Sequence, residues 1–422
     1  MKWTDRHGPT FAALCGSLTA VLAARLSLGN DSRFAEESGV WFGQLVTPQW
    51  SGFVTVSVAL LTILAVQVRR SALLVALAGV TGPVVIALPA LVPVAGNQAV
   101  SVSAVGAGLL LGASAVISVT RRAAQVALIV GVSVGVLFWG AVRALLPSEE
   151  GRWLVSVGPS YVEPSAHPVV LLAVAVLVSV VALRLGPLAS DEATTRTILA
   201  LIALVFVYLL AYIFLGSITS ATWGWTLAVV VSCASTLAAS RLVDARDGVI
   251  LMVGLAVAAT TVTGLAWSSR SLWIALGGVA VLALAAVLGS HRPHVLVGLS
   301  VLACVAATGL LTHTAGLNVV PTVAYTLLFP AAVGFSLGSA LPVNLPASAM
   351  APAIPMTLTL FSVSAPNVPS VYYWTDGTAT GYEGPVVAAL SPLNIGVLVS
   401  VSVIVFAGLA IARRPGRHLH AS

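Results

Sequence analysis

One stretch of the sequence has the spacing of a catalytic motif. Gly334, Ser336 and Gly338 fit G-x-S-x-G, in which a strand-to-helix turn exposes a nucleophilic serine. Asp376 and His418 follow in the chain order of hydrolase triads. The motif, however, lies in an apolar run that we predict to be a membrane helix, and Asp376 and His418 are predicted on opposite sides of the bilayer. We therefore interpret these small residues as helix-packing positions and predict that the protein is not an enzyme.

The sequence also excludes several cofactor-dependent chemistries. Its single lysine is Lys2, so it has no G-x-x-x-x-G-K-[ST] phosphate loop and no membrane lysine that could form a Schiff base. It has no H-E-x-x-H motif, and its seven histidines are spread along the chain without a metal-binding spacing. Cys15, Cys233 and Cys304 all lie in apolar runs, where small buried residues are common. We expect no cofactor and no bound metal.

The region between residues 294 and 412 combines an apolar composition with many helix breakers. It holds only two charged side chains, Asp376 and Glu383. Prolines recur in it at positions 321, 330, 342, 346, 352, 355, 366, 369, 385 and 392. Irregular backbone at membrane depth is tolerated only against protein or a watery cavity, and interrupted helices often mark transporter sites. This region is our candidate for a membrane cavity; the alternative is a set of ordinary kinks and turns.

Most candidate substrate-binding residues come from this region. Tyr325 and Asn344 stand close to its prolines, and the loop 370–385 combines aromatic rings, hydroxyls and acids. Such a loop suits a sugar, an interfacial belt or a protein partner. Arg143, on an earlier span, could hold an anionic group or extend to the membrane interface. The full set is Arg143, His313, Asn318, Tyr325, Asn344, Tyr373, Trp374 and Asp376.

The composition places the chain in a membrane. Hydrophobic residues make up 59% of the 422 residues and charged residues only 8%, whereas soluble domains carry roughly 25% charged residues. The net charge is +6, but the basic residues form short clusters between apolar runs, which is typical of membrane orientation and not of nucleic-acid binding. We expect membrane lipids as partners and no nucleic acid. The dominance of Ala, Val and Arg predicts a GC-rich bacterial genome, and therefore a multi-pass protein of the bacterial plasma membrane.

The apolar runs predict an all-α, polytopic transmembrane helical bundle. A helix needs about 20 apolar residues to cross a bilayer, and the connections between the runs are short, so we predict a single integral membrane domain over residues 1–422. The predicted spans are 9–28, 51–68, 71–94, 101–120, 123–146, 168–187, 196–217, 221–240, 248–267, 271–289, 294–312, 319–338, 345–364 and 393–412.

Arginine and tryptophan predict the same orientation. With the N-terminus in the cytoplasm, 14 of the 19 basic residues fall inside, and all tryptophans except Trp3 fall at or beyond the outer boundary. The C-terminal cluster that starts at Arg413 then lies inside, so both termini are cytoplasmic. The eleventh span ends outside and the C-terminal cluster lies inside, so an odd number of crossings must lie between them. We favour 14 spans; the alternative is 12 spans, with 319–338 and 345–364 forming a re-entrant or broken helix pair.

Small-residue spacings and proline patterns give only weak evidence of internal repetition. Gly108-x-x-x-Gly112 and Gly131-x-x-x-Gly135 permit close helix approach, but the chain contains 37 glycines, so such matches carry little information. The prolines at 83, 89 and 93 loosely resemble those at 330 and 342. We do not infer a repeat from these patterns.

The interiors of the predicted spans lack carboxylates. All 13 acids lie in loops or at span ends, whereas ion-driven carriers usually hold an acid at membrane depth. This absence argues against ordinary proton or sodium coupling.

Three functions remain open. The number of spans, the broken helices and the uncharged interior predict a transporter or flippase-like permease for an apolar or amphiphilic substrate. The alternative is a non-catalytic membrane subunit, either the permease partner of a separate ATPase or an envelope-assembly scaffold. A lipid-linked glycosyltransferase is the third hypothesis, because Asp31, Glu36 and Glu37 follow the first span. Its outer loops, however, are short and poor in basic residues for a charged donor.

Overall fold

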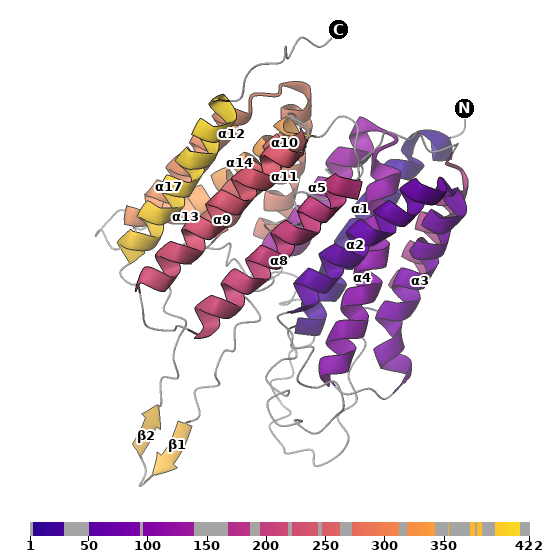
Figure 1. Ribbon diagram of the computed structural model, residues 1–422, viewed down its shortest axis with the longest axis horizontal. Coiled ribbons are helices and arrows are strands. Elements are labelled where there is room, and N and C mark those ends of the chain that lie inside the picture. Colours follow the sequence, from indigo (N-terminus) through magenta and orange to yellow (C-terminus); the bar gives the residue numbers. More distant parts are fainter. Residues whose placement is uncertain are drawn as a thin grey trace.

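The computed structural model describes residues 3–28, 50–92, 96–138, 168–185, 195–217, 222–243, 247–261, 272–311, 319–341, 353, 372–375, 378–381 and 393–413. Nearly all regular structure in this part of the chain is helical (Figure 1). The first helices are α1 (Trp3–Leu28), α2 (Trp50–Arg69), α3 (Ala72–Leu91), α4 (Gly96–Ser118), α5 (Arg122–Leu137) and α7 (Pro168–Leu183). The later ones are α8 (Thr195–Ser217), α9 (Thr222–Leu242), α10 (Asp247–Thr261), α11 (Leu272–His291), α12 (Val295–Ala307), η2 (Thr308–Leu311), α13 (Val319–Val323), η3 (Ala324–Leu328), α14 (Phe329–Ser339) and α17 (Leu393–Ala412).

Helices occupy thirteen of the fourteen apolar runs of the sequence. The run 345–364 lies outside the described residues except for Ala353, which is helical and buried. Among the described helices, six are long and apolar enough to cross a membrane. These six are His7–Ala24, Ser51–Arg69, Ala72–Pro89, Ala99–Ser118, Leu272–His291 and Val319–Ser339. Large aliphatic side chains on the outer faces of α3, α7 and α11 are exposed, as expected of surfaces that face lipid.

The helices run alternately up and down, so their polar ends sort into two layers. Figure 1 shows that α1 begins and α17 ends at the same end of the molecule. The last turns of α2 and α9 and the first turn of α5 are at that end, and they contain Arg69, Arg241 and Arg122, respectively. The first turn of α11 is at the opposite end and carries Trp273, which is 81% exposed. This separation matches the distribution that the sequence analysis assigned to the two membrane interfaces.

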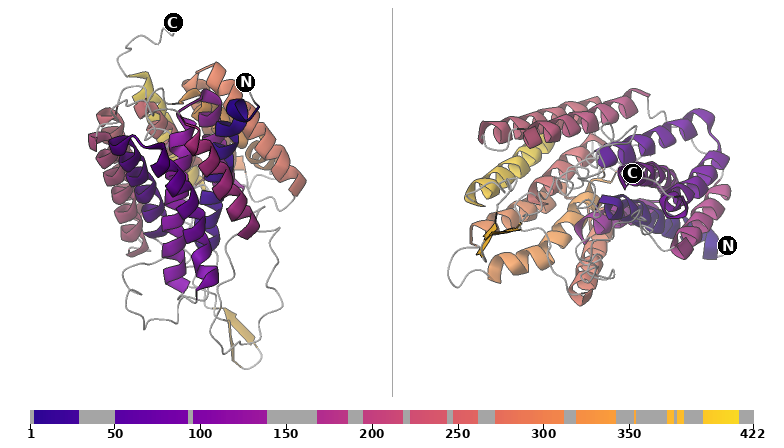
Figure 2. Two further views of the ribbon diagram at one scale, coloured as in Figure 1. Left: turned by 90° about the vertical axis from the view of Figure 1, so that its right-hand side faces the viewer. Right: turned by 90° about the horizontal axis from the view of Figure 1, so that it is seen from below.

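Two helical bundles lie side by side, with the same internal packing in each (Figure 2). In the first bundle α2 and α3 both pack on α4, α3 and α1 both pack on α7, and α1 packs on α4. In the second bundle α11 and α12 both pack on α14, α12 and α10 both pack on α17, and α10 packs on α14. Helices α1, α2, α3, α4 and α7 therefore correspond to α10, α11, α12, α14 and α17.

Glycine contacts confirm this correspondence in detail. Gly108 and Gly112 of α4 lie against α2, where an added Cβ would be 2.6 Å from the Thr55 carbonyl oxygen and 2.8 Å from that of Ala59. Gly334 and Gly338 of α14 make the equivalent close contact with Leu282 and Ala286 of α11. Gly82 of α3 faces Leu110, midway between the α4 glycines, just as Gly298 of α12 faces Ser336, midway between the α14 glycines. Small residues let these backbones approach closely.

The two bundles therefore share the spacing of their glycines and not that of their prolines. The loose resemblance between the prolines of α3 and those near residue 330 has no structural counterpart, because α3 corresponds to α12 and not to α14. Helices α8 and α9 stand between the two bundles in the sequence. In space, α8 packs on α2 of the first bundle and α9 packs on α10 of the second.

The proline-rich run 319–338 forms one continuous but irregular helix. Residues Ala324–Leu328 are π-helical and join α13 to α14 without a break. Pro330 is the second residue of α14, after Phe329. Proline has no backbone N–H and its ring crowds the preceding turn, and a wider π turn accommodates such a position. The irregularity predicted for this run is present as a local widening.

The aromatic loop contains a short hairpin that the sequence analysis did not predict. Strands β1 (Tyr372–Thr375) and β2 (Thr378–Gly381) pair antiparallel, with Tyr372 opposite Gly381 and Thr375 opposite Thr378. Tyr, Trp and Thr favour strands, and the intervening Asp-Gly pair suits a two-residue turn. Figure 1 shows the hairpin beyond the helix ends opposite to the end where α17 finishes.

Candidate substrate path between the two bundles

Helix α5 forms the centre of the interface between the bundles. It packs on α1 and α4 of its own bundle and on α11 and α14 of the other. Thirteen of its sixteen residues are buried. We call the α5–α11–α14 contact region the seam, because it is where the two repeated units meet.

The two faces of α5 have different roles. Gly131 lies against Ser17 of α1, and Gly135 lies against Val21 one turn further along. These two glycines therefore define the face that packs within the first bundle. Arg122 lies on the opposite face, because nine residues correspond to two and a half turns of helix. Residues 126, 129 and 133 lie on the same side of the helix as Arg122 and face the second bundle. We call this row of residues the α5 stripe.

A polar contact closes the seam at its arginine-rich end. Arg122 Nη2 donates a hydrogen bond to the carbonyl oxygen of Ser290, in the last turn of α11, with an N–O distance of 3.4 Å. The last carbonyls of a helix carry the negative end of its dipole, which favours a nearby cation. Arg122 is exposed, so this bond is accessible to solvent and weak. Its importance is positional, since it joins the ends of two helices that belong to different bundles.

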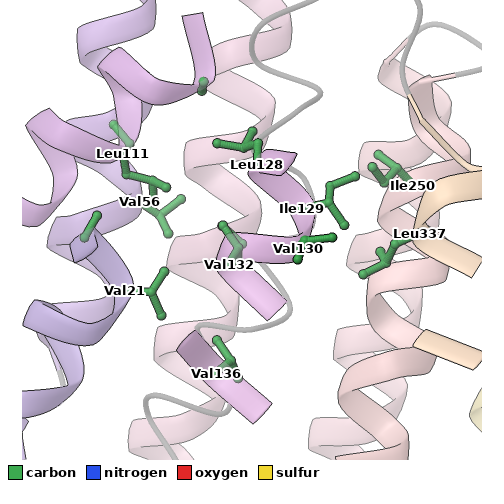
Figure 3. Close-up of a cluster of buried hydrophobic side chains, with 14 of the residues drawn as sticks. Val21, Val56, Leu111, Leu128, Ile129, Val130, Val132, Val136, Ile250 and Leu337 are labelled. Carbon is green, nitrogen blue, oxygen red and sulfur yellow. The ribbon is translucent and has the colours of Figure 1, made fainter. Parts of the chain in front are cut away.

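Further along α5 from this contact, the seam and the adjoining surface of α10 are apolar. Figure 3 shows Ile129 of α5 directed toward Ile250 of α10, with Leu337 of α14 beside Ile250. All three side chains are buried and belong to a single hydrophobic cluster that extends through both bundles. The two bundles are therefore held together here by nondirectional packing. A contact of this kind can separate and re-form without leaving a charge unpaired.

Ser133 is a polar residue within the apolar part of this face of α5. Its side chain is fully buried, and its hydroxyl has no hydrogen-bond partner among the residues that the structure describes. Many buried hydroxyls in the described helices bond to the preceding turn, as Ser114 does with the Leu110 carbonyl at 2.8 Å. The hydroxyls of Ser51, Ser57, Ser336 and Ser339 lack a partner among the described residues, as that of Ser133 does. Unpartnered buried hydroxyls are uncommon because they lose their hydration without compensation.

The α8–α9 hairpin flanks the two bundles. Phe206 of α8 stacks at a tilt on Phe53 of α2, with ring centroids 5.8 Å apart. Within the hairpin, the buried Tyr208 hydroxyl forms a hydrogen bond with Thr236 of α9. The hairpin therefore has its own internal polar contact and an aromatic contact with the first bundle.

Asp247 is the only acid whose side chain lies in the described part of the chain. It stands in the first turn of α10, at the arginine-rich end, and is 4% exposed. A helix N-terminus stabilises a carboxylate. Its position at a helix end agrees with the sequence analysis, which placed every acid outside the span interiors.

Of the predicted substrate-binding residues, Tyr325 has a described side chain. It is 4% exposed, lies in the π-helical segment η3 and stacks on Phe329 with ring centroids 5.6 Å apart. Single π turns within α-helices often occur at functional sites. For Tyr373 and Trp374 the structure describes only the backbone, in β1. Arg143, His313, Asn318, Asn344 and Asp376 lie outside the described residues.

The catalytic interpretation of Ser336 can be rejected on geometry. Ser336 lies within the regular helix α14, with its side chain against Gly298 of α12. It is fully buried, and no described side chain, histidine included, forms a hydrogen bond with its hydroxyl. The G-x-S-x-G match is a packing motif, as the sequence analysis proposed.

Sequence reasoning did not identify the α5 stripe. In the sequence, Arg122 indicates only the orientation of the chain, and nothing distinguishes Ser133 from other serines in apolar runs. The available signal was the pair Gly131 and Gly135, which fixes the inner face of α5 and thereby the outer one. That signal becomes useful only when the partner helix is known.

The helical architecture and its apolar outer faces define a multi-pass membrane protein. Solved structures with a similar fold include the crystal structure of the human organic anion transporter MFSD10 (TETRAN). The two align with a TM-score of 0.53 and 14% sequence identity, over 96% of this chain and 99% of that chain. At this identity the match shows a shared fold alone. No family model and no curated protein matches the sequence.

Proposed function

We propose that this protein is a membrane transporter in which the two bundles move against each other and expose the seam to either side in turn. The observation that supports this most is the repeated packing pattern, since the seam joins two similar units through apolar contacts. Transporter folds built from repeats place the substrate site at the repeat interface. The fold shared with a human transporter supports the same proposal.

The proposed substrate is apolar or amphiphilic, and transport is permease-like or flippase-like. The described seam is lined mainly by aliphatic side chains, which stabilise apolar surface. A substrate with a fixed positive charge would need an acid at depth, and Asp247, the acid with a described side chain, lies at a helix end. The similar human protein is named an organic anion transporter; for this chain we propose the broader amphiphilic class.

The proposed topology has 14 spans, with both termini in the cytoplasm of a bacterial cell. In the first bundle α5 stands between α4 and α7 in the sequence. The run 345–364 stands in the same order between α14 and α17. We assign it as the counterpart of α5, which makes it a full crossing and places the β1–β2 hairpin outside.

The sequence-derived site residues are retained in this proposal as candidates at the outer part of the path. Tyr325 supports their placement, because it is buried within an irregular helical segment. Replacing Tyr325, Asn344 or Arg143 by alanine should each weaken transport. Unchanged transport in all three variants would remove this part of the site.

The experiment that tests the function uses purified protein in proteoliposomes. We would follow three amphiphilic dyes: neutral Nile red derivatised with a sugar, anionic anilinonaphthalene sulfonate and cationic rhodamine 6G. The proposal predicts protein-dependent movement of the neutral or anionic dye down its gradient, without a nucleotide. Movement of none of the dyes, in protein whose fold is intact by circular dichroism, would contradict it.

The same preparation distinguishes the transporter from the alternative function as a membrane subunit. A permease partner of a separate ATPase should be inactive alone and should co-purify with that protein from its native membrane. Transport by the single purified chain would exclude this alternative. Its main support is the lack of acids within the predicted spans.

A further inference from the structure

The unpartnered hydroxyl of Ser133 marks a specific point on the seam. Ser133 lies eleven residues after Arg122, which is three helical turns and about 16 Å along α5. That distance is close to half of the roughly 30 Å hydrocarbon core. Arg122 contacts α11 at one membrane interface, so Ser133 lies on the same side of α5 near the middle of the membrane.

The opposing helix offers this hydroxyl no hydrogen-bonding side chain. Helices α5 and α11 run in opposite directions and meet at Arg122 and Ser290. The stripe of α11 that continues from Ser290 carries Ala283 and Val279, both partly buried against the apolar cluster. Neither side chain can donate or accept a hydrogen bond. On its other side, α5 is occupied by α1 through Gly131 and Gly135.

We propose that Ser133 is a substrate-binding residue, which forms a hydrogen bond with an uncharged polar group on a largely apolar molecule. This inference rests on the proposed transport function, because the ligand reaches Ser133 only when the bundles separate. A carbonyl or hydroxyl on the substrate forms a hydrogen bond with the Ser133 hydroxyl. Val126 and Ile129, on the same face of α5, pack on the apolar part of the substrate. A hydroxyl can both donate and accept a hydrogen bond. Ser133 therefore selects for a substrate that carries a polar group, whether that group is a donor or an acceptor.

The test uses two light-activated probes with the protein in lipid nanodiscs. The first is 4-hexylbenzophenone, whose carbonyl accepts a hydrogen bond and is also the reactive group. The second is a hexylphenyl trifluoromethyl diazirine, which has no carbonyl or hydroxyl. Covalent adducts are located by mass spectrometry of peptides from α5 and α11. The variants are Ser133→Ala, Ser133→Thr, which keeps the hydroxyl, and Ser114→Ala, which removes a hydroxyl that is already paired within α4.

The proposal predicts that benzophenone adducts concentrate on the seam peptides of the wild-type protein. Ser133→Ala should lower them about five-fold, the size expected for loss of one hydrogen bond. Ser133→Thr and Ser114→Ala should leave them near the wild-type level, and diazirine labelling should be the same in every variant. Seam labelling that does not depend on Ser133 would overturn this inference and leave the proposed function standing. Absence of seam labelling with both probes in all variants would overturn both.

Discussion

Arg122 and Ser290 join two different bundles through one hydrogen bond at 3.4 Å. Arg122 starts α5 and Ser290 lies in the last turn of α11, and each helix otherwise packs mainly within its own bundle. The contact lies at the arginine-rich end of the molecule, where α1 begins and α17 ends. Closure of the seam at this end, with apolar packing below it, describes the state of the protein in this structure.

We first predict that Arg122→Gln opens this end of the seam more often. Glutamine cannot keep the charge that interacts with the end of the α11 dipole. A cysteine placed at Gln125, which is buried one turn below, should then react a few-fold faster with a membrane-impermeant maleimide. Arg69→Gln is the control, because it removes an arginine from the same end without changing α5. Equal reaction rates in both variants would show that Arg122 does not hold the seam.

The glycine contacts predict different effects for chemically identical substitutions. Gly338→Ala forces a methyl group into the Ala286 backbone of α11 and should destabilise the protein by about 1–3 kcal/mol. Gly112→Ala should act similarly at the equivalent contact with α2. Gly277→Ala meets no atom of the described residues within 4 Å, so it should be neutral or slightly stabilising through helix propensity. Melting temperatures in detergent measure all three.

A lower melting temperature for Gly277→Ala alone would contradict the packing assigned to α11 and α14. The three variants differ only in what surrounds the added methyl group. A uniform effect would mean that glycine flexibility, and not close helix approach, determines stability at these positions.

The Tyr208–Thr236 contact within the hairpin predicts an energetic coupling. Both residues are buried, so Tyr208→Phe should cost about 1 kcal/mol and leave the Thr236 hydroxyl bonded to the Ser232 carbonyl. Thr236→Val should cost more, because it also leaves the tyrosine hydroxyl unsatisfied. A double-mutant cycle on unfolding should give a coupling well above measurement error. Strict additivity would show that the two hydroxyls do not interact.

The arrangement of the polar ends predicts which positions are accessible from outside the cell. Thr378 in the β1–β2 hairpin and Arg413 after α17 lie at opposite ends of the molecule. A cysteine at Thr378 should react with an impermeant maleimide in intact cells. A cysteine at Arg413 should react only after the membrane is permeabilised. The reverse pattern would invert the proposed orientation, and labelling of both in intact cells would contradict the odd number of crossings between them.

Sequence patterns predicted the helices well, because each span needs its own apolar run and that run is visible without knowing its partners. The repeat was not predictable. Gly108-x-x-x-Gly112 and the glycines of the G-x-S-x-G match are structural equivalents, but between them only the spacing is shared. In lipid, helices associate through small residues and close packing, so many sequences satisfy the same contact.

The site was only partly accessible to sequence reasoning. Tyr325 could be selected because helix breakers surround it, and it lies in a π-helical segment. Ser133 could not be selected, because a serine in an apolar helix usually bonds to its own preceding turn. Its missing partner follows from which helix faces α5, and that is tertiary information.

The most direct test of the proposed mechanism is to lock the seam by covalent cross-linking. In a background where Cys15, Cys233 and Cys304 are replaced by alanine, cysteines at Arg122 and Ser290 would be bridged with a short bifunctional methanethiosulfonate. The matched control bridges Ser179 and Ala76, whose hydrogen bond of 3.2 Å joins α7 to α3 within the first bundle. Dye transport in proteoliposomes is then measured before bridging, after bridging and after reduction.

Movement of the two bundles against each other predicts that the 122–290 bridge reduces transport to the level of protein-free liposomes, that reduction restores it, and that the 179–76 bridge has no effect. Undiminished transport with the 122–290 bridge fully formed would contradict it.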